Sequence, residues 1–153
     1  MHFILRGQTV IAALLLALAC SGSAVAADAK QEANRKVVLD FYEKGLNQKD
    51  ADAAIALMGN RYVQHNPNAV DGPEGFRKFI GFLREKFPNS RSEIKRSFVD
   101  GDYVILHVHA VRELGTRGTA IVDIFKLENG KIVEHWDAVQ PIPENPANNN
   151  GMF

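Results

Sequence analysis

The chain has 153 residues, and its 18 Lys and Arg residues balance 18 Asp and Glu residues, so the formal net charge at pH 7 is zero. This length is enough for one domain with a substantial core. The basic residues form no run or patch, which argues against nucleic acid as a partner.

The first residues are typical of an export signal. Arg6 gives a short positive start, residues 10–19 form an apolar run too short to span a bilayer comfortably, and Ala24 and Ala26 suit a cleavage site. We expect cleavage after Ala26, a periplasmic or secreted protein, and no membrane contact afterwards. An uncleaved membrane anchor is the alternative. Removing 26 residues from 153 leaves 127, with 17 basic and 18 acidic side chains.

The only cysteine, Cys20, lies inside this segment. A lipoprotein signal would instead be cleaved just before Cys20 and acylated there, but such signals usually have Leu where this chain has Ala17. With cleavage after Ala26, no disulfide is available, so the core alone must stabilise the fold. The sequence predicts three parts: a signal peptide over 1–26, a domain over 27–139, and an extended tail over 140–153.

Three helices are predicted at the start of the domain. Apolar residues at helical spacing indicate a helix over about 31–46, and Asp50 can cap a shorter one over 51–58. Asp71 and Glu74 have nearly the spacing of a capping box. A helix follows them, with an apolar stripe along one face, and Pro88 ends it.

After Pro88 the hydrophobic period changes to two, which indicates strands. Four are predicted, over residues 92–100, 103–113, 119–127 and 131–139. The chain therefore belongs to the α+β class, with about three N-terminal helices packed on one face of a strongly curved antiparallel sheet. Such a sheet leaves a hollow beside the helices that suits a small molecule.

The register of the last hairpin decides which side chains face this hollow. A two-residue Asn129-Gly130 loop would turn Asp123 and Asp137 to opposite faces. A three-residue loop, with Gly130 in the left-handed conformation, pairs Leu127 with Lys131 and turns both aspartates to one face.

We favour the three-residue loop because it also sets Lys126 near Glu134 on the other face, where opposite charges attract. It places Asp123 across from His135. Phe125 and Val133 then become walls of the same pocket.

The preceding hairpin adds two histidines to this face. If Glu113 pairs with Thr119, His109 lies opposite Asp123 and His107 lies opposite Phe125. The predicted inner face then carries one polar cluster: His107, His109, Asp123, His135 and Asp137.

A carboxylate in an apolar wall is costly unless it is paired or useful. Asp137 or Asp123 could take a proton from a carbon beside a carbonyl, and His135, His109 or Tyr62 could polarise that carbonyl. A half-buried histidine on a strand, however, is more often a hydrogen-bonded wall residue than a catalyst.

Metal binding is a rival chemistry, because His107 and His109 form an H-x-H pair that Asp123 or His135 could complete. No second dense ligand motif supports it, and we predict no metal. No serine or cysteine nucleophile has a supporting motif.

Three segments resemble the SnoaL-like branch of the NTF2-like superfamily: residues 62–67 (YVQHNP), Asp71-Gly72, and residues 123–137 (DIFKLENGKIVEHWD). The resemblance extends over about residues 33–143. It implies a cone-shaped barrel in which helices are wrapped by a bent antiparallel sheet around a cavity.

The resemblance also implies an activity. Founding members of the family are polyketide cyclases that close a ring by aldol condensation without metal or cofactor, and Asp137 matches their general acid/base. Asp123 stands where those cyclases usually have a histidine. An asparagine of theirs falls at Gln64 or His65.

We therefore expect a cofactor-free acid/base enzyme that acts on a small, largely apolar carbonyl compound. Asp137 is its acid/base, assisted by His135 and Asp123. The ligand is oriented by a second set of residues: Tyr62, His65, His107, His109 and Phe125. A non-catalytic binding or interaction module is the alternative.

The family commonly forms dimers through the outer face of the sheet. Here that face is predicted to be unusually apolar, which predicts a homodimer. Its expected apolar members are Val104, Leu106, Val108, Ile124 and Trp136.

Overall fold

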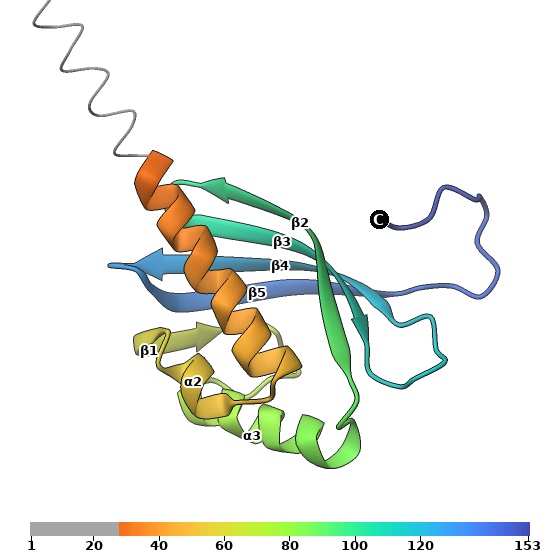
Figure 1. Ribbon diagram of the computed structural model, residues 1–153, viewed down its shortest axis with the longest axis horizontal. Helices are drawn as coiled ribbons and strands as arrows, with labels where there is room; N and C mark the ends of the chain where they lie inside the picture. Colours follow the sequence, from red (N-terminus) through yellow and green to blue (C-terminus); the bar gives the residue numbers. More distant parts are fainter. Residues whose placement is uncertain (1–27) are drawn as a thin grey trace, which may run out of the picture.

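The structure is a computed structural model that describes residues 28–153 (Figure 1). The predicted signal peptide, with Cys20 and the cleavage site after Ala26, lies outside the described residues. The N-terminal helix spans 28–42 and continues as a π-helical turn, η1 (Glu43–Asn47). Among residues 28–153, no helix combines the length and apolarity needed to cross a membrane.

Two further helices follow. The shorter, α2 (Ala51–Ile55), is capped as predicted, since the Asp50 side chain accepts a hydrogen bond from the Ala53 N–H at 3.0 Å. The longer helix, α3 (Gly72–Lys86), begins after Asp71, but the predicted capping box is wrong. The Asp71 carboxylate accepts a hydrogen bond from the Gln64 N–H instead, at 2.7 Å, and so ties the start of α3 to a strand.

The sheet has five strands in the order β1-β5-β4-β3-β2. They are β1 (Met58–Gln64), β2 (Arg91–Asp100), β3 (Tyr103–Val111), β4 (Thr119–Glu128) and β5 (Lys131–Pro141). All neighbouring pairs are antiparallel except β1 and β5, which are parallel. The sequence did not predict β1, because Gly59 and the exposed Asn60 and Arg61 break the alternation by which a strand is recognised.

The helices cover one face of the bent sheet, and the N-terminal helix crosses it obliquely (Figure 1). The core lies between these layers, where Phe41 from that helix packs on Phe76 of α3 and Phe125 of β4, with ring centroids 4.9 and 5.7 Å apart. This arrangement confirms the predicted α+β class with helices on a curved sheet.

The β4–β5 hairpin turns tightly. Glu128 pairs with Lys131 across Asn129 and Gly130, both at positive φ (51° and 70°), so the predicted three-residue loop is wrong. The register then shifts by one residue where Leu127 pairs with Ile132 but Lys126 pairs with Glu134. This bulge at Val133 restores the alternation that the loop was expected to give.

As a result, Asp123 and Asp137 do share one face, as predicted. They lie directly opposite each other, however, and His135 is paired with Phe125 rather than with Asp123.

The β3–β4 hairpin corrects a second prediction. Ala110 pairs with Thr119, so the expected pairing of Glu113 with Thr119 is off by three residues. An odd shift exchanges the two faces of a strand. The strand residues expected on the outer face are therefore completely buried under the helices: Val104, Leu106 and Val108.

The tail leaves β5 after Pro141 and returns to the outer face of the sheet. The Phe153 ring lies 5.2 Å from the His107 ring and 4.9 Å from the His109 ring, measured between centroids. The outer side of β3 is therefore partly covered by the end of the chain.

The tight turn makes a specific prediction about stability. Gly130→Ala should lower the free energy of unfolding by about 1 kcal/mol, because alanine is strained at the positive φ of this residue. Gly81→Ala is the matched control: it lies inside α3, its added methyl group meets nothing within 4 Å, and it should raise stability by about 0.5–1 kcal/mol. Urea unfolding measures the free energy of unfolding of both variants. If both substitutions changed it in the same direction, the assigned turn would be contradicted.

Candidate functional site

Three polar side chains of the β4–β5 hairpin meet beneath the helices: Asp123, His135 and Asp137. One ligand-type atom of each lies within 4.8 Å of the others. Asp123 and His135 are only 4% and 8% exposed, whereas Asp137 is half-buried. The cluster can therefore be approached from the Asp137 side.

Both carboxylate oxygens of Asp123 have partners. The Tyr42 hydroxyl donates to Oδ2 at 2.7 Å, and Nε2 of His135 contacts Oδ1 at 2.9 Å. Hydrogen bonds of this kind offset the large cost of removing a carboxylate from water.

The hydrogen-bond pattern also determines the protonation of His135. The Asn66 N–H can only donate, so the Gln64 atom that faces it at 2.9 Å is the amide oxygen. The same oxygen faces His135 Nδ1 at 3.0 Å, and therefore Nδ1 carries hydrogen. One proton then lies between Nε2 and Asp123, which makes the pair either imidazolium with carboxylate or imidazole with carboxylic acid.

Asp137 has a different environment. The Asn66 amide nitrogen is 2.7 Å from its Oδ1 and 2.8 Å from its Oδ2, so a neutral donor orients both oxygens. Among the described residues, no cation forms a salt bridge with Asp137. The two aspartates of the hairpin thus differ: Asp123 is buried and proton-linked to a histidine, while Asp137 is half-exposed beside an amide.

Two tyrosines line the same region. The pKa of the Tyr42 hydroxyl is held well above 10, first by burial and then by the negative charge and hydrogen bond of Asp123. The pKa of Tyr62 is also raised, first by burial and then by the charges of Asp123 and Asp137. Both hydroxyls therefore stay protonated and can donate hydrogen bonds.

Aromatic rings form the apolar wall. The Phe125 ring lies 4.7 Å from the His135 ring and meets the Tyr42 ring edge-on at 6.4 Å, between centroids. The predicted residues Tyr62, Asp123, Phe125, His135 and Asp137 are therefore brought together by the structure.

Three predicted site residues are not part of this cluster. His107 and His109 lie on the outer face of β3, because of the register shift described above, and they contact Phe153. His65 also points outward and stacks on Trp136 at 4.4 Å. The expected cluster of three histidines and two aspartates on one face is therefore wrong, and the predicted ligand-orienting residue His65 also lies outside the cluster.

Two residues of the network, Tyr42 and Asn66, were not predicted from the sequence, and a third, Gln64, was indicated only through the family resemblance, as one of two possible positions. Tyr42 lies within the predicted first helix and has no role in the predicted site, although its hydroxyl reaches Asp123. Gln64 and Asn66 lie on the unpredicted strand β1 and just after it. The alternation of Tyr62, Gln64 and Asn66 was the available signal, since residues two apart on a strand share a face.

The donor set of Asp123, His135 and Asp137 has the chemistry of a metal site. In this structure, however, the two imidazole nitrogens and four carboxylate oxygens are all hydrogen-bonded to protein groups. A metal ion would have to replace several of these bonds. The H-x-H pair lies on the opposite face, so it cannot join Asp123 or His135 in one metal site.

The fold and the position of the cluster define a class: helices on a bent sheet, with polar groups on the inner face of the last hairpin. Residues 38–135 match the family model of the SnoaL-like domain, which is more than half of the chain. The chain therefore belongs to the SnoaL-like family, as the resemblance indicated. No curated protein is significantly similar to it in sequence.

Solved structures share the fold at low identity. An NTF2-like protein of unknown function from Cytophaga hutchinsonii is 20% identical, with a TM-score of 0.59 over 71% of this chain and 90% of that one. A candidate SnoaL-like polyketide cyclase from Jannaschia is 23% identical, with 0.58 over 71% and 86%. AclR, a candidate hydroxylase from Streptomyces galilaeus, is 19% identical, with 0.62 over 76% and 91%.

The raised tyrosine pKa values predict a loss of stability in alkali. Folded Tyr42 and Tyr62 keep their protons above pH 10, whereas the same hydroxyls ionise in the unfolded chain. The contribution of these tyrosines to stability should therefore be fully present below about pH 10 and fall above it, by up to about 1.4 kcal/mol per pH unit for each tyrosine. Urea unfolding at pH 8–11.5 measures this slope.

Tyr42→Phe should reduce the slope, and Tyr103→Phe, at an exposed tyrosine, is the matched control. An unchanged slope in Tyr42→Phe would contradict the assignment.

Proposed function

We propose that the protein is a cofactor-free acid/base enzyme that acts on a small, largely apolar carbonyl compound by aldol-type or isomerase-type chemistry. The observation that supports this most is the contrast between the two aspartates. Asp123 is committed to Tyr42 and His135, whereas Asp137 is half-buried and contacts a neutral amide. Asp137 is the group that a substrate could reach.

In this proposal, Asp137 removes a proton from the carbon beside the carbonyl and becomes a carboxylic acid. The resulting enolate carbon attacks a second carbonyl of the same molecule, and Asp137 returns the proton to the new alkoxide. The carbon–hydrogen bond and the π bond of the second carbonyl break, while a carbon–carbon bond and an oxygen–hydrogen bond form, so no electron donor or acceptor is needed.

Tyr62 is the proposed donor to the enolate oxygen. Its hydroxyl already accepts a hydrogen bond from the Gln64 side-chain amide at 3.4 Å, which leaves its own hydrogen free to donate. The raised pKa keeps that hydrogen in place. A donor aimed at developing negative charge in a buried site stabilises the transition state strongly.

Asp123 and His135 support the site without touching the reacting carbon. Their shared proton keeps the buried pair neutral overall, and His135 Nδ1 holds the Gln64 amide in the orientation that Tyr62 requires. Phe125, which is 1% exposed, packs against the rings of His135 and Tyr42 and so holds both in place.

Relatives support this proposal to different degrees. The similar Jannaschia structure is described as a candidate polyketide cyclase, which agrees with it. AclR is described as a candidate hydroxylase, so one fold serves more than one chemistry.

A binding module is the second candidate, because every polar side-chain atom of Asp123 and His135 is already hydrogen-bonded. In that case the cluster would only line a ligand site.

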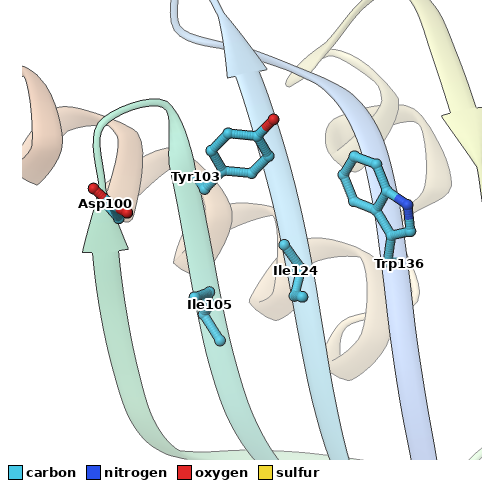
Figure 2. Close-up of a pocket in the computed structure, with 5 residues that line it drawn as sticks. All are labelled: Asp100, Tyr103, Ile105, Ile124 and Trp136. Carbon is cyan, nitrogen blue, oxygen red and sulfur yellow. The ribbon is translucent and has the colours of Figure 1, made fainter.

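We also propose a homodimer formed through the outer face of the sheet, although not through the residues first expected. Figure 2 shows Tyr103, Ile105, Ile124 and Trp136 on the side of the sheet away from the helices. With Asp100 they line a shallow hollow of about 410 Å³. Phe98, 55% exposed, pairs with Ile105 on the same face. Apolar and aromatic side chains gathered on an outer face in this way support an interaction site there.

Export, with cleavage after Ala26, remains part of the proposal. The N-terminal sequence of protein recovered outside the cytoplasm would test it.

Asp137→Asn tests the enzyme proposal directly. The amide is close in size to the carboxylate but cannot accept the proton, so the folded variant should lose at least about a hundredfold in rate. The measurement is hydrogen–deuterium exchange at carbon, followed by NMR, over a panel of ketones and β-dicarbonyls with mature protein. Asp52→Asn, which changes a surface carboxylate that pairs with Arg77 of α3 away from the site, is the control and should retain activity.

Equal exchange by wild type and Asp137→Asn would reject Asp137 as the base. Ligand binding without exchange in either protein would favour the binding module.

The dimer is tested by Ile124→Lys, which places a charge at the centre of the outer apolar surface. Light scattering should give twice the mass of one chain for the wild type and the mass of one chain for the variant. Val70→Lys makes the same change at an exposed loop residue and should remain dimeric. A wild-type mass of one chain would contradict the proposal.

A further inference from the structure

The end of β1 and the two residues after it contact the strand that carries His135 and Asp137. Three consecutive residues, 64–66, contact three consecutive residues of β5. The Gln64 side chain contacts His135 and the Asn66 side chain contacts Asp137. Between them, the His65 ring points to the outer face and stacks on Trp136. This follows from the alternation of side chains along an extended chain.

The backbone ladder that supports these contacts is short. β1 is an edge strand, and its parallel pairing with β5 includes only Met58, Val63 and Gln64, with a register shift between the first two. The His65 N–H adds one more bond, to the His135 carbonyl at 2.9 Å. Backbone pairing alone therefore fixes the segment that carries Gln64 and Asn66 only weakly.

The His65 side chain adds two contacts on the outer face. Its ring lies flat on the Trp136 indole, with centroids 4.4 Å apart and planes 4° from parallel. Its Nε2 is 3.2 Å from Glu134 Oε2. These contacts join β1 to the two residues that flank His135 on β5.

We propose that His65 is a positioning residue for the site: from the outer face it clamps β1 onto β5 and thereby holds Gln64 on His135 and Asn66 on Asp137. The proposal rests on the proposed function for its effect on rate. Its structural part, the placement of the Asn66 amide, can be measured whether or not the protein is an enzyme.

Glu134 has other charged partners besides His65, so the role of His65 can be tested separately from that of Glu134. Glu134 is also bound by Lys126 of β4 at 3.0 Å and by Arg61 of β1 at 3.4 Å. The pKa of Glu134 is lowered first by Lys126 and then by His65. Glu134 therefore keeps two cationic partners when His65 is replaced, and the changes expected below come from the lost clamp.

The experiment compares His65→Ala, His65→Phe and His109→Ala in the mature protein. His65→Ala removes both outer contacts, while His65→Phe keeps a flat ring for Trp136. His109→Ala removes an outer-face histidine that contacts Phe153 and not β1. Each variant is first shown to be folded by its unfolding midpoint in urea.

Two readouts follow the clamp. The first is the Asn66 side-chain amide resonance in a ¹⁵N spectrum. The hydrogen bond to Asp137 shifts this resonance. The second is the fluorescence of Trp136, the only tryptophan of the chain. In His65→Ala, the amide should move toward the position of a solvated amide and the fluorescence should change, while His109→Ala should leave both unchanged.

For catalysis of carbon exchange, His65→Ala should lower kcat by about ten- to a hundredfold with a smaller change in KM, since small displacements of catalytic groups cost this much. His65→Phe should recover most of the loss.

A His65→Ala protein whose Asn66 amide keeps its wild-type resonance would overturn the proposal. So would a kcat equal to that of His109→Ala. If no protein catalyses exchange, the amide resonance still decides the positioning role, and only the proposed function fails.

Discussion

The contact between Asp123 and His135 is the constraint on which the rest of this structure depends. A carboxylate that is 4% exposed requires partners, and it obtains them from two directions: His135 on the neighbouring strand and Tyr42 on the N-terminal helix. The helix is thereby fixed on the sheet by a polar bond as well as by apolar packing around Phe41 and Phe125. Removing one partner would leave a buried group unpaired, which costs more than the bond itself contributes.

The same contact gives the two carboxylates of the hairpin different tasks. Because Asp123 already shares a proton with His135, the negative charge close to the half-buried opening belongs to Asp137. Asn66 orients that charge without neutralising it. The two aspartates are chemically identical, but they differ in burial and in their partners. Asp123 is buried beside a histidine, and Asp137 is half-buried beside an amide.

The sequence predicted the class of fold and the helices well, because apolar stripes and caps are local signals. It predicted the strands but not their pairing, since pairing depends on loop lengths and bulges. The shared face of Asp123 and Asp137 was predicted through a three-residue loop, whereas the structure reaches it through a two-residue turn and a bulge at Val133. The odd shift between β3 and β4 moved His107 and His109 to the outer face, which no local pattern indicates. Asn66 was not predicted, and Gln64 was indicated only by the family resemblance, because β1 has Gly59 and polar residues where a strand signal is expected.

The position of Phe153 has a practical consequence for handling the protein. The last residue of the chain rests on His107 and His109, and Met152 lines a second hollow of about 480 Å³ beside Val122 on the outer side of the sheet. Any affinity tag fused to the C-terminus therefore starts at this face and not in free solvent. A tag placed just before Asp28 would instead start at the N-terminal helix, away from the tail, and would leave the outer face as it is found here (Figure 1).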